Sequence, residues 1–200
     1  MAVNQLAIDR LRLDEAFSTG THRPFNDCWT VRMDRCLLIV DDDQEHYSRF
    51  SEDQENQWKA IMIVNEENRE VVLLSIDNKL IANHRGGIAD CAVFDDEQFH
   101  LIEFKTNAYG HSEESARDTF DKAISQLEET ICVFSDKLQS VSIEFMNAVV
   151  LSCHIVVSNS FPKSKATKQE YRLKFADNHN GIELSFAEKI YWEKIGGELF

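Results

Sequence analysis

One stretch of the chain, GGIADCAVFDDEQFHLIEFKTN over residues 86–107, constrains the fold more than any other. Two apolar runs flank an acidic segment, which is the pattern of two β-strands joined by a tight turn. The second run, FHLIEFKT, carries Glu103 and Lys105 between apolar residues. Because a buried charge is costly unless it is paired, these two residues indicate a site with a specific partner rather than an ordinary core strand.

The register of this hairpin brings three charged residues to one face. Side chains alternate faces along a strand, so Glu103 and Lys105 share a face. A turn centred on Asp96-Glu97 places Asp90 directly opposite Glu103, whereas a three-residue turn would shift the register and separate the faces. Opposed residues have Cβ atoms roughly 5 Å apart, and like charges there destabilise a sheet. Because Mg²⁺ commonly binds through one or two carboxylates, the hairpin predicts a divalent-cation site.

These residues resemble the PD-(D/E)XK nuclease superfamily, which includes restriction enzymes, RecB-like nucleases and Holliday-junction resolvases. In that family a β-hairpin carries an Asp and then a Glu or Asp, one further residue and a Lys, and a helix follows. Asp90 and the tripeptide Glu103-Phe104-Lys105 match this motif. The periodic apolar segment from Ser112 to Leu138 stands in the place of the helix.

The helical segment matches the RecB-like branch in part. Gln126 stands where those members carry a Gln, whereas Thr130 replaces the aromatic residue expected four positions later. Ala89 stands where the family name has a proline, which is a frequent variation. The resemblance covers residues 86–138, and the flanking segments follow it only in the order of their strands.

The resemblance implies a metal-dependent mechanism. Asp90 and Glu103, with the backbone carbonyl of Phe104, would hold one or two Mg²⁺ or Mn²⁺ ions. The metal would polarise the scissile phosphate and lower the pKa of a bound water. Lys105 would orient that water or offset the charge that builds on the phosphate oxygens, and Gln126 would position Lys105 or a phosphate.

A further acid often lies on a helix before the hairpin in this family. Glu15, in the amphipathic segment at residues 4–17, is our nominee. Glu45, Glu52 and Glu55 are equal alternatives if residues 44–57 are helical. The acidic run that begins with Asp41-Asp42-Asp43 is interpreted as a solvated loop, which is the usual role of such a run.

The order of the patterned segments predicts an α/β fold with a mixed β-sheet flanked by helices, in one domain over residues 1–200. The resemblance implies a restriction-endonuclease-like core at residues 86–138, with flanking elements at 1–85 and 139–200. The local predictions are a strand over 29–40, a hairpin over 58–76, a second hairpin over 170–186 and a closing helix over 187–200.

The charge of the chain limits how it would bind nucleic acid. Its formal net charge is −14, whereas a free-standing duplex-binding protein usually presents a broad basic surface. We therefore expect DNA binding to use a local basic feature, a bound metal, or a protein partner or homodimer. Lys163, Lys165 and Lys168 lie in the one concentrated basic segment and are candidate phosphate contacts, although a solvated hairpin loop fits this segment as well.

The cysteines and the apolar runs indicate a cytoplasmic protein. The five cysteines are scattered and form no CxxC pair, which fits reduced thiols better than disulfides or a zinc site. The run NAVVLSCHIVV is much too short to span a bilayer, so no membrane association is expected.

Two functions from different classes remain open. The first is a metal-dependent nuclease that hydrolyses phosphodiester bonds in DNA, with RNA left open as a substrate. The second is a catalytically inactive nuclease fold that acts as an interaction or scaffold subunit, which the acidity of the chain favours. The complete set of Asp90, Glu103 and Lys105 favours the nuclease, because a scaffold has no need of two opposed acids and a lysine.

Overall fold

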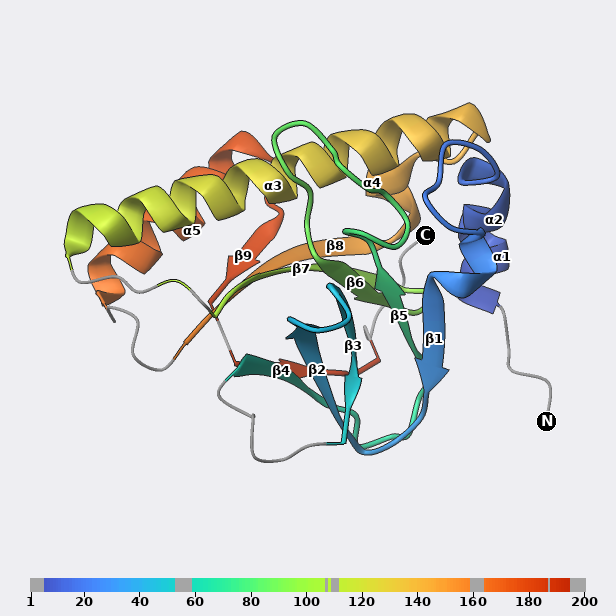
Figure 1. Cartoon of the computed structure of the whole chain (residues 1–200), viewed down its shortest axis with the longest axis horizontal. Helices are drawn as coiled ribbons and strands as arrows, with labels where there is room; N and C mark the ends of the chain where they lie inside the picture. Colours follow the sequence, from blue (N-terminus) through green and yellow to red (C-terminus); the bar gives the residue numbers. More distant parts are fainter. Residues whose placement is uncertain are drawn as a thin grey trace.

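The computed structural model describes residues 6–52, 59–106, 108, 112–158, 164–186 and 188–194. These residues form three layers, namely helices, a six-stranded sheet and a four-stranded sheet (Figure 1). The long helix α3 (Glu113–Ser140) runs across the outer face of the larger sheet. The predicted α/β class, with a mixed sheet flanked by helices, is confirmed.

The larger sheet changes strand direction at β7. Its neighbours from β1 to β7 are antiparallel, whereas β7 pairs with β8, and β8 with β9, in parallel. The strands, in their order across the sheet, are β1 (Trp29–Arg32), β5 (Val71–Ser75), β6 (Cys91–Phe94), β7 (Gln98–Lys105), β8 (Val150–Val157) and β9 (Glu183–Ser185).

Helix α3 begins at a capping box and packs through one apolar stripe. The Ser112 hydroxyl accepts a hydrogen bond from the Ser115 N–H at 3.1 Å, which satisfies a backbone donor that the helix leaves open. Apolar side chains three or four positions apart then face the sheet, as a helical period requires. The buried ones are Ala116, Phe120, Ala123, Leu127, Ile131, Phe134 and Leu138.

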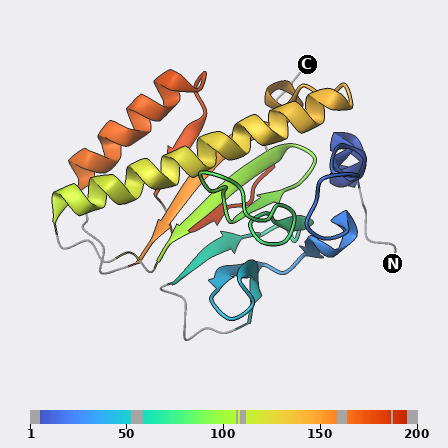
Figure 2. The ribbon, with the colours of Figure 1, turned by 45° about the horizontal axis from the view of Figure 1, so that its top comes forward.

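The other helices lie along α3. Helix α5 (Lys165–Asn178) runs beside its first half (Figure 2), where Arg117 pairs with Glu170 at 2.9 Å. The short helices α1 (Leu6–Leu11), α2 (Leu13–Ala16) and α4 (Phe145–Ala148) lie near its last turns, and η1 (Phe25–Asp27) precedes β1. Among the described helices, none is long and apolar enough to cross a membrane.

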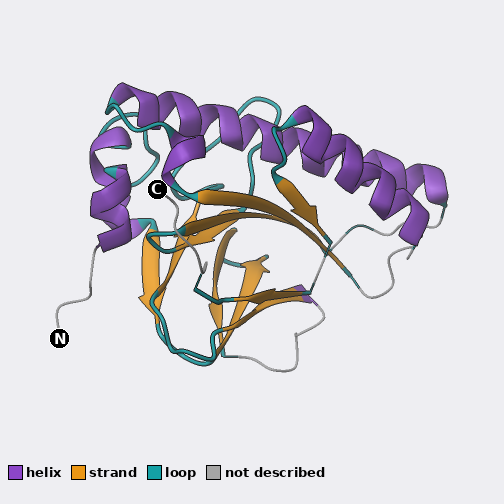
Figure 3. Ribbon diagram, turned by 180° about the vertical axis from the view of Figure 1, so that it is seen from behind, coloured by secondary structure: helices purple, strands orange, loops and turns teal. Residues whose placement is uncertain are grey.

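The smaller sheet packs on the face of the larger sheet that is opposite α3 (Figure 3). Ile39 and Ile61 from this sheet are fully buried in a shared core with Ile102 from β7. Its strands, in order, are β10 (Lys189–Tyr191), β4 (Ala60–Val64), β2 (Cys36–Asp42) and β3 (Tyr47–Ser51).

The prediction of a hairpin over residues 58–76 is wrong, because β4 and β5 belong to different sheets. The turn between them is held by Asn65, whose side chain donates to the Arg69 carbonyl at 2.7 Å and accepts from the Arg69 N–H at 2.9 Å. The same amide donates to the Asp34 carbonyl at 3.2 Å. Likewise residues 29–40 form two strands, β1 and β2, so the chain crosses between the two sheets here as well.

The two predictions at the C-terminal end are also wrong. The first half of the hairpin predicted over residues 170–186 lies in helix α5, because Thr167, Tyr171 and Phe175 recur at a helical spacing and are buried. Ser164 caps this helix by accepting from the Thr167 N–H at 3.3 Å. In the segment predicted as a closing helix, residues 189–191 form the parallel strand β10.

Candidate active site

The predicted register of the central hairpin is confirmed. Cys91 pairs with Ile102 in the antiparallel ladder of β6 and β7. The Asp95 N–H donates to the Gln98 carbonyl at 3.1 Å, which closes a turn centred on Asp96-Glu97. Asp90 immediately precedes Cys91, so the same register sets it opposite Glu103.

Asp90 is fixed through both its backbone and its side chain. Its carbonyl accepts hydrogen bonds from the N–H groups of Ile76 at 2.9 Å and Asp77 at 3.2 Å. Its carboxylate oxygen Oδ2 accepts from the Phe104 N–H at 2.6 Å. The Phe104 side chain lies in the core between the two sheets, and its carbonyl as a metal ligand stays a prediction.

Glu103 is buried and incompletely paired. Its side chain is 1 % exposed, and its oxygen Oε1 forms an ion pair with the ammonium group of Lys105. The other oxygen, Oε2, is buried without a hydrogen-bond partner among the described residues. Such a carboxylate oxygen carries a desolvation cost that a cation would offset.

Lys105 links the hairpin to helix α3. Besides pairing with Glu103, its Nζ donates to Gln126 Oε1 at 2.7 Å. Gln126 is itself held, because its Nε2 donates to the Ile88 carbonyl at 3.2 Å. The sequence-predicted residues Asp90, Glu103, Lys105 and Gln126 are therefore brought together.

Two residues outside the motif position Gln126. Gly87 has a φ of +86°, and a Cβ there would lie 2.9 Å from Gln126 Nε2, so the close approach requires glycine. The Thr130 hydroxyl accepts from the Ala89 N–H at 2.7 Å and donates to the Gln126 carbonyl at 2.7 Å. Thr130, which departs from the RecB-like pattern, thus joins the helix to the segment that leads to Asp90.

Two further acids approach the pair, and sequence reasoning missed both. Asp41 is in β2 of the smaller sheet, and Asp77 follows β5. Both line a cavity of about 110 Å³ that Asp90 also lines. The signal for them in the sequence is weak: each directly follows an apolar run, as a residue at the carboxyl end of a strand does.

The electrostatics of the site disfavour the charged state of its acids. Burial raises the pKa of Asp90 well above its usual range, and the charges of Glu103 and Asp41 raise it further. Burial raises the pKa of Glu103 to about 7 against the opposing charge of Lys105, and Asp41 and Asp77 add to the rise. Burial likewise raises the pKa values of Asp41 and Asp77. When these four acids are ionised, the site holds more negative charge than Lys105 alone neutralises.

The donor set fits a hard cation bound by few protein ligands. No three His, Cys, Asp or Glu side chains of the described residues are grouped so that they could hold a metal ion. Mg²⁺ needs no such cage, because it keeps several waters and commonly uses one or two carboxylates. Asp90 and Glu103 meet that requirement, and in this arrangement Asp41 and Asp77 act on them through charge.

The structure does not bring the nominated further acids to this pair. Glu15 pairs with Arg12 at 2.6 Å, and Arg12 also donates to the Val141 carbonyl at the far end of α3 from Gln126. Glu45 is exposed in the turn between β2 and β3, and Glu52 pairs with Arg32 at 3.2 Å. Glu55 lies outside the described residues.

The predicted basic segment lies mostly on α5. Lys165 is the first residue of this helix and is exposed, and the Lys168 ammonium lies 5.4 Å from the centre of the Phe186 ring. Neither lines the cavity beside Asp90. Lys163 lies outside the described residues.

Comparisons of the chain with protein-family models, curated proteins and solved structures found no match. The resemblance to PD-(D/E)XK nucleases therefore rests on the residues and contacts described above.

Proposed function

We propose that this chain is a metal-dependent nuclease of the PD-(D/E)XK type, with a restriction-endonuclease-like core, that hydrolyses phosphodiester bonds in DNA. The observation that carries the proposal is the buried Glu103 Oε2, which has no hydrogen-bond partner among the described residues, in a hairpin that sets Asp90 opposite Glu103. Buried polar groups are usually hydrogen-bonded. A carboxylate oxygen left without a partner next to a second carboxylate therefore supports binding of a cation.

Asp90 and Glu103 would hold Mg²⁺ or Mn²⁺, with the Phe104 carbonyl as a further ligand. Asp41 and Asp77, rather than the nominated Glu15, are the further acids near this pair, and they would act on it through their charge. When bound, the ion polarises the phosphate and lowers the pKa of a water molecule.

Lys105 has one N–H donor that is bonded to neither Glu103 nor Gln126. A lysine ammonium group carries three N–H donors, and here Glu103 and Gln126 take two of them. The third would donate to a non-bridging phosphate oxygen, where negative charge develops during hydrolysis. Gln126 acts as a positioning residue, because it holds the ammonium group rather than the substrate.

The acidity of the chain bears on how it would bind DNA. With 35 acidic against 21 basic residues, the chain would gain affinity for DNA from the metal and from a protein partner or a second copy. The cytoplasm, which keeps thiols reduced, is the proposed compartment.

The test is a cleavage assay in Mg²⁺ or Mn²⁺ on linear duplex, supercoiled plasmid, single-stranded DNA and RNA. We expect metal-dependent cleavage that falls more than about 100-fold in Glu103→Gln, because a metal ligand matters at least as much as a residue that supports one. Melting curves of both proteins show that each is folded. If the folded native protein cleaves none of the four substrates, the nuclease proposal fails and the inactive scaffold takes its place.

A further inference from the structure

A pair of cations gathers on one aromatic ring beside the candidate active site. The Lys79 ammonium lies 4.2 Å from the centre of the Tyr47 ring, and the Arg23 guanidinium carbon lies 5.8 Å from it. We call these three residues the Tyr47 cluster. Both distances are within the range of cation–π attraction, so the ring holds two like charges near each other.

The cations of the Tyr47 cluster differ from several other cations of this chain in how they are paired. Within the described residues, neither Arg23 nor Lys79 is in an ion pair. Burial lowers the pKa of Lys79, and the nearby Arg23 charge lowers it as well, while Cys28 and the acids Asp27 and Glu45 oppose this shift. Two neighbouring cations that form no ion pair within the described residues support binding of an external anion.

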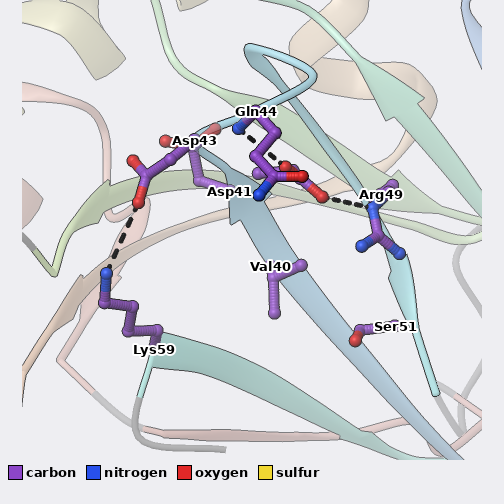
Figure 4. A pocket seen from close by; sticks show the side chains of 8 residues that line it. Val40, Asp41, Asp43, Gln44, Arg49, Ser51 and Lys59 are labelled. Atoms are coloured by element: carbon purple, nitrogen blue, oxygen red, sulfur yellow. Dashed lines mark hydrogen bonds and ion pairs between the residues drawn. The ribbon is translucent and has the colours of Figure 1, made fainter. Parts of the chain in front are cut away.

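Two cations nearby show the contrasting case. A cavity of about 290 Å³ next to the site is lined by Arg49 and Lys59, and both point to acids of the same cavity (Figure 4). Arg49 pairs with Asp42 at 2.6 Å, and Lys59 pairs with Asp43 at 3.4 Å. Because their charges are met within the protein, these two residues are poorer candidates for binding an anion.

The Tyr47 cluster adjoins the proposed catalytic acids. Tyr47 lines the same cavity of about 110 Å³ as Asp77 and Asp90. Lys79 comes two residues after Asp77, whose N–H donates to the Asp90 carbonyl. An anion held by the cluster would therefore lie next to a phosphate held at Asp90 and Glu103.

We propose that the Tyr47 cluster is a phosphate-binding subsite for a single-stranded segment of DNA next to the scissile phosphate. This inference rests on the proposed nuclease function and names its substrate class. Single strands are held by a few cations combined with aromatic rings, whereas a duplex needs a broader basic surface. Arg23 and Lys79 contact the phosphates, and Tyr47 is a positioning residue that holds the two cations.

The experiment measures binding of a fluorescein-labelled 20-nucleotide single strand by anisotropy. Asp90→Asn is the background, because it keeps the labelled strand intact and removes one repelling charge. Adding Arg23→Ala and Lys79→Ala should raise the Kd at least tenfold. It should also lower the slope of log K against log salt by about 1.4, since each phosphate contact to a single strand contributes about 0.7.

Two controls separate this inference from simpler explanations. The charge-matched pair Lys165→Ala and Lys168→Ala, on α5, should leave the Kd within twofold of the background. Tyr47→Phe keeps the ring and should bind like the background, whereas Tyr47→Leu removes the ring and should weaken binding severalfold. Melting curves show which variants are folded.

The outcomes distinguish this inference from the proposed function. Four results would each overturn the subsite. The first two are unchanged binding in the Arg23 and Lys79 variant and a loss of binding in the Lys165 and Lys168 variant instead. The other two are tighter binding of duplex than of single strand and no binding of single strand by the background protein. None of these results bears on cleavage by the native protein, which decides the nuclease proposal separately. Conversely, a native protein that does not cleave, combined with binding that depends on the Tyr47 cluster, would uphold single-strand binding at the cluster and overturn the nuclease.

Discussion

Strand β7 carries polar side chains on both faces, and the two sets differ in the chemical groups that they bring together, namely imidazole, amide and hydroxyl groups on one face and a carboxylate with an ammonium group on the other. On the face toward the smaller sheet, His100 contacts Gln98 at 3.0 Å and Ser152 at 2.6 Å, and it lies 3.0 Å from His154. On the face toward α3, Glu103 has one oxygen in an ion pair and one without a hydrogen-bond partner among the described residues, and on the other face His154 Nδ1 likewise has none among them.

The state of charge separates the two sets further. Burial lowers the pKa of His100 to about 4, and the pKa of His154 is lowered as well, so both rings are neutral at pH 7. The acids on the other face repel one another. A buried network built for stability is neutral and hydrogen-bonded, whereas a set of groups that opposes its own burial is typical of a functional site.

The largest effect expected from this difference is that Mn²⁺ stabilises the fold by binding to the acids on the face of β7 toward α3, and not to the histidines on the other face. At pH 8 and a Mn²⁺ concentration of about 100 times Kd, binding stabilises the fold by about 2.7 kcal/mol. This is a rise in Tm of about 5–10 °C for a chain of this size. Asp90→Asn should abolish the rise, and its metal-free form should melt above the native protein because a like charge is gone.

The measurement is thermal unfolding in EDTA and in Mn²⁺. Asp118→Asn, an exposed acid on α3, is the matched control and should respond like the native chain. A Tm that is the same with and without Mn²⁺ in the native protein would contradict a metal site at Asp90 and Glu103.

The second effect is that the two faces of β7 titrate in opposite senses. Glu103 has a folded-state pKa of about 7 against an ordinary value of 4.5, so its contribution to stability is present below pH 4.5 and is lost as the pH rises through 7. His100 has a folded-state pKa of about 4 against 6.5, so its contribution is present above pH 6.5 and is lost as the pH falls through 4. Each contributes on the order of 1–3 kcal/mol.

Urea unfolding of the metal-free protein across pH 4 to 8 checks these signs. From pH 6.5 to 8 the stability of the native protein should fall, and Glu103→Gln should flatten this side of the profile. Between pH 4.5 and 6.5 the variant should show a steeper rise in stability than the native protein, because the His100 contribution is then no longer opposed by that of Glu103. A native profile that rises through pH 7 to 8 would show that Glu103 is ionised in the folded chain at lower pH than its surroundings indicate.

The third prediction distinguishes two effects of replacing a glycine in the loop before β6, namely displacement of Gln126 and backbone strain at a positive φ. Gly86 and Gly87 both have positive φ, but only at Gly87 would a Cβ meet Gln126. Alanine at either position should destabilise the fold by about 1–3 kcal/mol. Gly87→Ala should in addition slow cleavage about tenfold or more, because it displaces the residue that holds Lys105. Equal cleavage rates in the two variants, measured under single-turnover conditions, would remove Gln126 from the mechanism.

The smallest effect belongs to the neutral face. Ser152→Ala removes a hydroxyl from the histidine network, at a cost of about 1 kcal/mol in the free energy of unfolding. The cleavage rate below the melting temperature should not change. If Ser152→Ala slows cleavage as strongly as Gly87→Ala, the distinction between a structural face and a functional face of β7 is lost.

The central hairpin and α3 could be predicted from the sequence because their determinants are local. The turn centred on Asp96-Glu97 sets the register, and the register sets Asp90 opposite Glu103. Likewise, Ser112 and the spacing of apolar residues define α3. Each of these features depends on neighbours within a few positions along the chain or across one turn.

The rest of the site could not be predicted because it depends on how the layers pack. Asp41 approaches Asp90 only after the smaller sheet docks on the larger one, and no spacing in the sequence encodes that contact. The hairpin predicted over residues 58–76 failed for the same reason. Two adjacent apolar runs satisfy a hairpin pattern equally well when Asn65 directs them into separate sheets.

The parallel strand β10 has a consequence for when the acidic site is completed during synthesis. Residues 189–191 add the edge strand beside β4, and Trp192, which is 1 % exposed, fills the core between the two sheets. The sheet that carries Asp41 is therefore finished by residues that leave the ribosome about 90 positions after Glu103. A nascent chain that ends before residue 189 has made every acid of the site but lacks the edge strand and the Trp192 side chain, so the layer that carries Asp41 is completed late in synthesis.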